Sequence, residues 1–160
     1  TGRWLALGIF VVASLSDWLD GYLARAWQQQ SALGRMLDPI ADKLLVGATL
    51  LILVHDRTID GYAVFAAVIV LCRELLVSGL REFLAGLNVE VHVTLLAKWK
   101  TGVQLLALAL LIAGPAGETL FPGLRDLGLG CLWIAALLTL WTGFGYLRAA
   151  IGYAIDPAHD

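Results

Sequence analysis

The sequence predicts an all-α fold, a polytopic bundle of helices embedded in a membrane. Hydrophobic residues make up 59% of the 160-residue chain and charged residues only 15%, and the mean hydropathy is +0.80. An ordinary soluble domain is about 45–50% apolar and about 25% charged. The apolar residues form long runs without the alternation that is typical of membrane β-strands. Helices are expected because they satisfy their own backbone hydrogen bonds in lipid.

Five apolar segments are candidates for membrane-spanning helices, since about 20 mostly apolar residues cross a hydrocarbon core of about 30 Å. They are approximately residues 4–25, 38–55, 61–84, 95–113 and 129–152. The first contains LALGIFVVASL and the second LLVGATLLILV. The third carries the charged stretch CRELLVSGLRE, the fourth follows AKWK with a long apolar run, and the fifth contains two tryptophans.

The connections between these segments are polar or rich in glycine and proline, which is typical of loops. They read WQQQSALGR, HDRTID, AGLNVEVHV and GPAGETLFPGLRD in chain order. No internal repeat or composition shift divides the chain. We therefore expect a single transmembrane domain over residues 1–160.

The distribution of lysine and arginine predicts the orientation in the membrane. One set of predicted helix ends carries Arg25, Arg35, Lys43, Arg81, Lys98, Lys100 and Arg148. The other set carries Arg3, Arg57 and Arg125. Because cytoplasmic loops are enriched in basic residues, we expect a multi-pass protein of the inner (plasma) membrane with the connection between the first two helices on the cytoplasmic side. No part of the sequence resembles a basic nucleic-acid-binding surface, so no nucleic-acid partner is expected.

Four aspartates flank the connection between the first two predicted helices. Asp17 and Asp20 are three residues apart, and Asp38 and Asp42 are four apart, so each pair shares one helix face. An antiparallel hairpin would bring both pairs together near the cytoplasmic interface. Solvated helix-end carboxylates are the alternative, but aspartates within membrane segments are rare and usually functional.

Four carboxylates in one place indicate a metal site. Their mutual repulsion would oppose joint ionisation unless a cation lay between them. Oxygen ligands without histidine favour Mg²⁺, Mn²⁺ or Ca²⁺ over zinc. Two such ions could stabilise both the attacking and the leaving oxygen of a displacement at phosphorus. The sequence therefore predicts a phosphoryl-type transfer at the membrane surface.

The spacing of these aspartates resembles the signature of the CDP-alcohol phosphatidyltransferase family. All eight fixed positions match, in the order Asp17-x2-Asp20-Gly21-x2-Ala24-Arg25-x8-Gly34-x3-Asp38-x3-Asp42. The resemblance implies an integral membrane enzyme that uses two divalent ions, Mg²⁺ or Mn²⁺. Such an enzyme transfers a phosphatidyl group from a CDP-linked lipid to an alcohol and releases CMP.

The resemblance also implies roles for the residues of the signature. Asp17, Asp20 and Asp38 would bind metal, and Asp42 would both bind metal and act as the general base. The CDP group would be bound by Gly21, Ala24, Arg25 and Gly34. An arginine that reaches the lipid headgroups is the alternative for Arg25.

The alcohol acceptor is indicated by basic residues of the third and fourth segments. Arg73 and Arg81 are eight residues apart and so lie roughly on one helix face, and with Lys98 and Lys100 they could form a basic pocket. Arg73, Arg81 and Lys98 could then bind an acceptor that itself carries a phosphate. Membrane anchoring is the alternative for Lys98, and an internal ion pair with Glu74 is the alternative for Arg73. The stretches RELLVSGLRE and VTLLAKWKTGVQ resemble phosphatidylglycerophosphate synthases within the family. The implied substrates are CDP-diacylglycerol and sn-glycerol 3-phosphate.

Four further expectations follow from the resemblance or compete with it. The family has six transmembrane helices and is homodimeric, so we expect a homodimer and an N-terminally incomplete domain that lacks the first helix. Inositol, inositol phosphate or serine would be the acceptor in other members of the family. A divalent-cation transporter is the alternative of another class, although the second, fourth and fifth segments offer almost no polar lining beyond Gln104.

Overall fold

The computed structural model describes residues 2–27, 32–86 and 95–155. Within its helices, side chains are described except at positions 17, 18, 20, 21, 23–27, 32–39, 95–98, 153 and 154. In the described part of the chain all regular structure is helical, which confirms the predicted all-α fold. The helices are α1 (Gly2–Trp27), α2 (Ala32–His55), α3 (Ala63–Gly86), α4 (Leu95–Gly117) and α5 (Leu124–Ile155).

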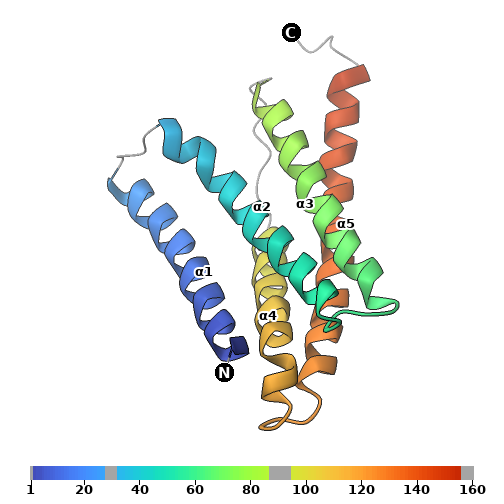
Figure 1. Cartoon of the computed structure of the whole chain (residues 1–160). Coiled ribbons are helices and arrows are strands. Elements are labelled where there is room, and N and C mark those ends of the chain that lie inside the picture. The colour runs from blue at the N-terminus through green and yellow to red at the C-terminus, as the bar shows by residue number, and fades with distance from the viewer. Residues whose placement is uncertain (1, 28–31, 87–94, 156–160) are drawn as a thin grey trace.

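The helices alternate in direction for the first three elements, and α4 and α5 form a second antiparallel hairpin (Figure 1). The most extensive helix contact is between α4 and α5, and α3 also packs on α5. Helix α1 packs mainly on α4, and α2 packs mainly on α3. The carboxyl ends of α1, α3 and α5 therefore lie at the same end of the bundle as the start of α2. This arrangement confirms the antiparallel α1–α2 hairpin expected from the sequence.

Three helices differ from their expected bounds by four residues or more, whereas α1 and α3 differ by two residues at each end. Helix α2 begins at Ala32 instead of residue 38, because the preceding ALGRML stretch is mostly composed of good helix formers. Helix α4 continues past Pro115 to Gly117, and Glu118 N still donates to Gly114 O at 2.9 Å. Helix α5 begins at Leu124 instead of 129, with Asp126 in its first turn, where a carboxylate suits the helix dipole.

Three helices are long and apolar enough to cross a membrane by length and composition, within the described residues: Ala63–Gly86, Trp99–Gly117 and Leu124–Gly152. The apolar part of α1 that meets the composition requirement is shorter, Gly2–Ser16. Many large apolar side chains remain exposed on the bundle, among them Leu51, Trp141 and Phe144. An apolar exterior of this kind suits lipid, so the structure is that of a membrane helix bundle.

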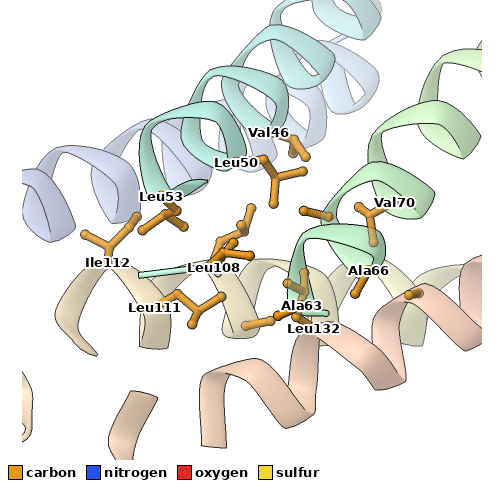
Figure 2. Packing of buried hydrophobic residues seen from close by; sticks show 14 of the residues in the cluster. Val46, Leu50, Leu53, Ala63, Ala66, Val70, Leu108, Leu111, Ile112 and Leu132 are labelled. Carbon is orange, nitrogen blue, oxygen red and sulfur yellow. The ribbon is translucent and has the colours of Figure 1, made fainter. Parts of the chain in front are cut away.

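The apolar core lies where α2, α3, α4 and α5 meet (Figure 2). Leu50, Leu108, Leu111 and Leu132 are at most 2% exposed and point toward one another from three helices. Alanines fill the closest contacts, at 63, 66, 67, 107 and 136. Small residues permit the close helix packing that drives association in lipid, where the hydrophobic effect between helices is weak.

Two arginines form ion pairs at the remote end of the bundle, opposite the end that carries Asp17, Asp20, Asp38 and Asp42. Arg125 Nε donates to Thr58 O at 2.9 Å and its Nη2 pairs with Asp60 Oδ1 at 2.9 Å. Arg3 Nη2 pairs with Asp56 Oδ2 at 2.8 Å. These contacts join the α2–α3 connection to α1 and α5. They fix one end of the bundle and leave the site to be built at the other.

Gly128 sets the approach of α5 to α4, and this can be tested. A Cβ atom at residue 128 would lie 3.0 Å from two atoms of Leu111, whereas a Cβ at Gly130 would meet nothing within 4 Å. Both changes to alanine gain the same helix propensity, but Gly128→Ala adds overpacking, which costs about 1–3 kcal/mol. We expect Gly128→Ala to melt several degrees below Gly130→Ala in detergent. Equal melting temperatures would show that this contact does not limit packing.

Candidate active site

The α1–α2 hairpin places the four predicted aspartates at comparable depth. Asp17 and Asp20 precede the end of α1 by ten and seven residues, and Asp38 and Asp42 follow the start of α2 by six and ten. At 1.5 Å per residue, all four backbone positions lie within about 15 Å of their helix ends along the axis. The hairpin therefore brings both pairs to one end of the bundle.

Most side chains of the predicted signature lie outside the described part of the structure. This applies to Asp17, Asp20, Gly21, Ala24, Arg25, Gly34 and Asp38, and also to Lys98 on α4. Convergence of the four carboxylates and contact with a nucleotide therefore stay predictions. Asp42, Arg73 and Arg81 are described, and the site is built from them.

The Asp42 carboxylate is paired with its neighbour in sequence. Lys43 Nζ donates to Asp42 Oδ2 at 2.9 Å, and the same Nζ lies 3.3 Å from Glu74 Oε2 on α3. The Asp42 side chain is 37% exposed and that of Lys43 is 22% exposed. Lys43 thus bridges a partly accessible carboxylate on α2 and a buried one on α3.

Glu74 is the centre of a buried group of charges. Its side chain is 8% exposed, and its Oε1 accepts hydrogen bonds from Lys100 Nζ of α4 and, at 3.3 Å, from Arg73 Nη1. A buried charge without a partner is costly, which explains why the carboxylate and its cations occur together. We call Lys43, Arg73, Glu74 and Lys100 the Glu74 cluster. It contains three positive charges and one negative charge, and it joins α2, α3 and α4.

Arg73 extends the Glu74 cluster to α5. Its Nε donates to Thr139 O at 3.0 Å and its Nη2 donates to Thr142 Oγ1 at 2.7 Å. Gly143 permits this approach, because a Cβ there would lie 3.3 Å from Arg73 Cγ. The ion pair with Glu74 that the sequence left open as an alternative is present. A role for Arg73 in binding phosphate stays a prediction.

Arg81 lies two turns further along α3 and is exposed. Its Nη2 donates to Tyr146 OH at 3.4 Å, and its guanidinium lies 5.8 Å from the centre of the Tyr146 ring. Since Arg73 and Arg81 both contact α5, they share one face of α3, as their spacing predicted. Arg81 is the more accessible of the two for an anionic ligand.

Three buried polar atoms near this end have no hydrogen-bond partner within the described structure, and one of them is Thr139 Oγ1, beside Arg73. Gln104 Oε1 belongs to a residue that is 3% exposed and lies one turn after Lys100 on α4. Ser14 Oγ lies one turn before Asp17 on α1, a helix that contacts α4. An unpaired buried polar atom costs about 1–3 kcal/mol, so such atoms indicate a place where a polar ligand or water is accommodated.

The residues present fit a hard divalent cation. No group of three or more potential ligands occurs among the described side chains, from which three of the four aspartates are missing. The predicted donor set consists only of carboxylate oxygens, which suits Mg²⁺ or Mn²⁺. Among the described contacts of Asp42, the hydrogen bond to Lys43 engages Oδ2 and leaves Oδ1 for another partner.

Sequence reasoning assigned no catalytic role to Lys43, Glu74 or Lys100. It places Lys43 only in the basic bias of the cytoplasmic ends, Lys100 beside Lys98 in a basic pocket for the acceptor, and Glu74 only as a partner for Arg73. The signal that identifies them is a charged residue within or beside an apolar run, which lipid tolerates only when the charge is paired. That signal does not specify which charges meet.

A separate cavity lies toward the remote end, between α1, α2 and α4. It measures about 270 Å³ and is lined mainly by apolar side chains such as Phe10, Leu53 and Ile112, with the Arg3–Asp56 pair at its edge. None of the predicted site residues lines it. It is therefore distinct from the site around Asp42.

Comparison with known proteins identifies relatives that cover almost the whole chain. The family model for CDP-alcohol phosphatidyltransferase matches residues 1–141. A protein of Rickettsia bellii named CDP-diacylglycerol--glycerol-3-phosphate 3-phosphatidyltransferase is 45% identical over 94% of this chain and 81% of the relative. Proteins with the same name from Cereibacter sphaeroides and Pectobacterium atrosepticum are 38% and 40% identical, over 96% and 93% of this chain and 84% and 80% of the relatives.

The two arginines of α3 provide a test of the buried network. Arg73→Met removes one partner of a buried ion pair together with two hydrogen bonds to α5, and breaking such a pair typically costs about 3–5 kcal/mol. Arg81→Met removes an exposed cation–π contact, which contributes about 0.5–1 kcal/mol. We expect thermal unfolding in detergent to show a much larger loss for Arg73→Met. Similar losses for the two variants would contradict a structural role for the Arg73 contacts.

Proposed function

The chain belongs to the CDP-alcohol phosphatidyltransferase family, and we propose that it transfers the phosphatidyl group of CDP-diacylglycerol to sn-glycerol 3-phosphate. The products would be phosphatidylglycerophosphate and CMP. The names of relatives at 38–45% identity support this reaction. The observation that carries the choice of acceptor is an excess of positive charge near Asp42, where Lys43, Arg73 and Lys100 are paired with only two described carboxylates, those of Glu74 and Asp42 itself.

The excess of cations favours an acceptor that carries its own phosphate. Inositol and serine bring no phosphate group, so they would leave this charge uncompensated among the described residues. Arg81, which is exposed at the same face of α3, and Lys98 would bind the phosphate of the acceptor. Arg73 would contribute its positive charge, since several of its donors are already engaged by Glu74 and α5.

Asp42 would act as the general base in this reaction. Its carboxylate would accept the proton of the primary hydroxyl of glycerol 3-phosphate. The hydroxyl oxygen then forms a bond to the phosphorus that carries the diacylglycerol group. The bond from that phosphorus to the oxygen bridging the diphosphate breaks, and CMP leaves with the electron pair. The partial exposure of Asp42 supports access of a water-soluble acceptor from the membrane surface.

The remaining residues of the signature would bind the nucleotide and the metal ions. Asp17, Asp20, Asp38 and Asp42 would hold two divalent ions, Mg²⁺ or Mn²⁺. When bound, these ions supply positive charge to the phosphate oxygens on which negative charge develops. Gly21, Ala24 and Gly34 would permit close approach of CDP, and Arg25 would pair with its phosphate.

The site would face the cytoplasm of a cell whose inner (plasma) membrane holds the protein. The helix ends with more lysine and arginine lie at the same end as the α1–α2 connection, which supports this orientation. A homodimer is part of the same proposal, as the family resemblance implies. Both substrates would then be reached from one side, the lipid within the bilayer and glycerol 3-phosphate from water.

The first test is the release of CMP from CDP-diacylglycerol by the purified protein in detergent. We expect release to require glycerol 3-phosphate and Mg²⁺ or Mn²⁺, and EDTA to abolish it because the carboxylates alone repel the diphosphate. Serine, inositol and inositol phosphate serve as competing acceptors. Release with one of these instead of glycerol 3-phosphate would overturn the choice of acceptor. Metal-independent release would contradict the metal mechanism.

The second test addresses Asp42 directly. Asp42→Asn removes the base and one metal ligand while retaining the size of the side chain, and loss of a general base alone typically costs 10²–10⁴-fold in rate. We expect kcat to fall at least about 100-fold. Asp126→Asn, an exposed change at the start of α5, is the control. Retention of more than a tenth of the activity in Asp42→Asn would exclude Asp42 as the base.

A further inference from the structure

The Asp42 carboxylate is attached to the buried part of the bundle through Lys43. Lys43 Nζ is 2.9 Å from Asp42 Oδ2 and 3.3 Å from Glu74 Oε2, so one ammonium group is shared by two carboxylates. Lysine is a flexible side chain whose ammonium group can adopt many positions. The position of this one is determined by the more rigid of its two partners.

Glu74 is that rigid partner. Its side chain is 8% exposed, and its second oxygen is bound by Lys100 from α4 and by Arg73 from its own helix. Arg73 is in turn fixed by Thr139 O and Thr142 Oγ1 of α5. Three helices therefore hold the Glu74 carboxylate in place. Asp42, by contrast, is partly exposed, and a carboxylate in such a position rotates unless a partner holds it.

We propose that Glu74 is a positioning residue for Asp42 and that it acts through Lys43. This inference rests on the proposed function, in which Asp42 is the base. Glu74 draws the Lys43 ammonium group toward α3, so that it holds Oδ2 of Asp42 and leaves Oδ1 directed to the acceptor hydroxyl or a cation. Without Glu74, Asp42 is the one described carboxylate left for Lys43. The ammonium group then shifts onto the base and the productive orientation is lost.

A merely structural role for Glu74 makes a different prediction. A buried ion pair that only joins α2, α3 and α4 would affect the free energy of unfolding, in which Glu74 and Lys43 also couple because they are in contact, but it would leave kcat and Mn²⁺ binding of the folded variants unchanged. A positioning role makes the two residues interdependent in kcat and Mn²⁺ binding as well, because each exerts its effect on Asp42 through the other. A double-mutant cycle measured in these two quantities separates the two roles.

The experiment compares Glu74→Gln, Lys43→Met and the double variant, with Glu118→Gln as the charge-matched control. Glu118 is exposed in the turn after α4, at the remote end of the bundle. We expect Glu74→Gln to lower kcat about 10-fold or more while KM for CDP-diacylglycerol changes less than about 3-fold, as for loss of an interaction that matters in the transition state. Glu74→Asp should restore part of kcat. In the Lys43→Met background, Glu74→Gln should have little further effect.

A second readout does not depend on turnover. Mn²⁺ is titrated into each variant in detergent and free Mn²⁺ is measured by electron paramagnetic resonance. Because Asp42 is a predicted ligand, we expect Glu74→Gln to weaken Mn²⁺ binding about 3-fold or more, and Glu118→Gln to leave it unchanged. This effect should also disappear in the Lys43→Met background. If Glu74→Gln does not yield monodisperse protein, Glu74→Asp completes the same cycle in both readouts.

The outcomes distinguish this inference from the proposed function. The wild-type protein could release no CMP with any acceptor and yet bind Mn²⁺ in a way that depends on Glu74 and Lys43. This result would overturn the proposed function and support the positioning role. An active wild-type protein in which Glu74→Gln behaves like Glu118→Gln in both readouts would overturn the positioning role. Additive effects of Glu74→Gln and Lys43→Met would do the same. Absence of both CMP release and Mn²⁺ binding in the wild type would overturn both proposals.

Discussion

The ion pairs of the buried Glu74 carboxylate are the interactions on which the aspartate end of the bundle depends. It receives cations from α2, α3 and α4, and Arg73 extends the network to the backbone of α5. In a low-dielectric interior such charges are stable only in mutual contact, since removing one partner leaves another buried and unpaired. Relative to an apolar core of the same shape this network need not add stability. What it provides is a defined geometry, because charged groups tolerate fewer alternative arrangements than apolar ones.

The two ends of the bundle differ in the contacts that join their helices. Around Leu108 and Leu132 the helices are joined by apolar packing, and at the remote end Arg3 and Arg125 tie the α2–α3 connection to α1 and α5. The aspartate end instead contains the buried Glu74 cluster and polar atoms, such as Gln104 Oε1, that are buried without a described partner. Uncompensated polarity of this kind is costly in a protein that only has to fold. The proposed anionic substrates and divalent ions would supply partners for these groups.

The sequence was sufficient for the fold class, because long apolar runs leave few alternatives to a membrane helix bundle. It also predicted the α1–α2 hairpin and the shared face of Arg73 and Arg81, which depend only on helical spacing. Helix bounds were wrong where the apolar run and the helix do not coincide, as at Ala32 and Leu124. The partners of Glu74 could not be predicted, because contacts between α2, α3 and α4 are set by how the helices pack. The four aspartates were recognised from their spacing, and their convergence stays a prediction.

The position of the site at one end of the bundle matches the physical problem of the proposed reaction. One substrate is anchored in the bilayer by its acyl chains, and the other is a highly charged molecule that does not enter lipid. Their reacting groups meet only at the interface, so a base for this reaction must be reachable from water and yet fixed from within. Asp42 is partly exposed, and through Lys43 it is connected to a carboxylate that three helices hold in place. In the proposed reaction, Asp42 would lie at the water boundary while its orientation would be determined within the bundle.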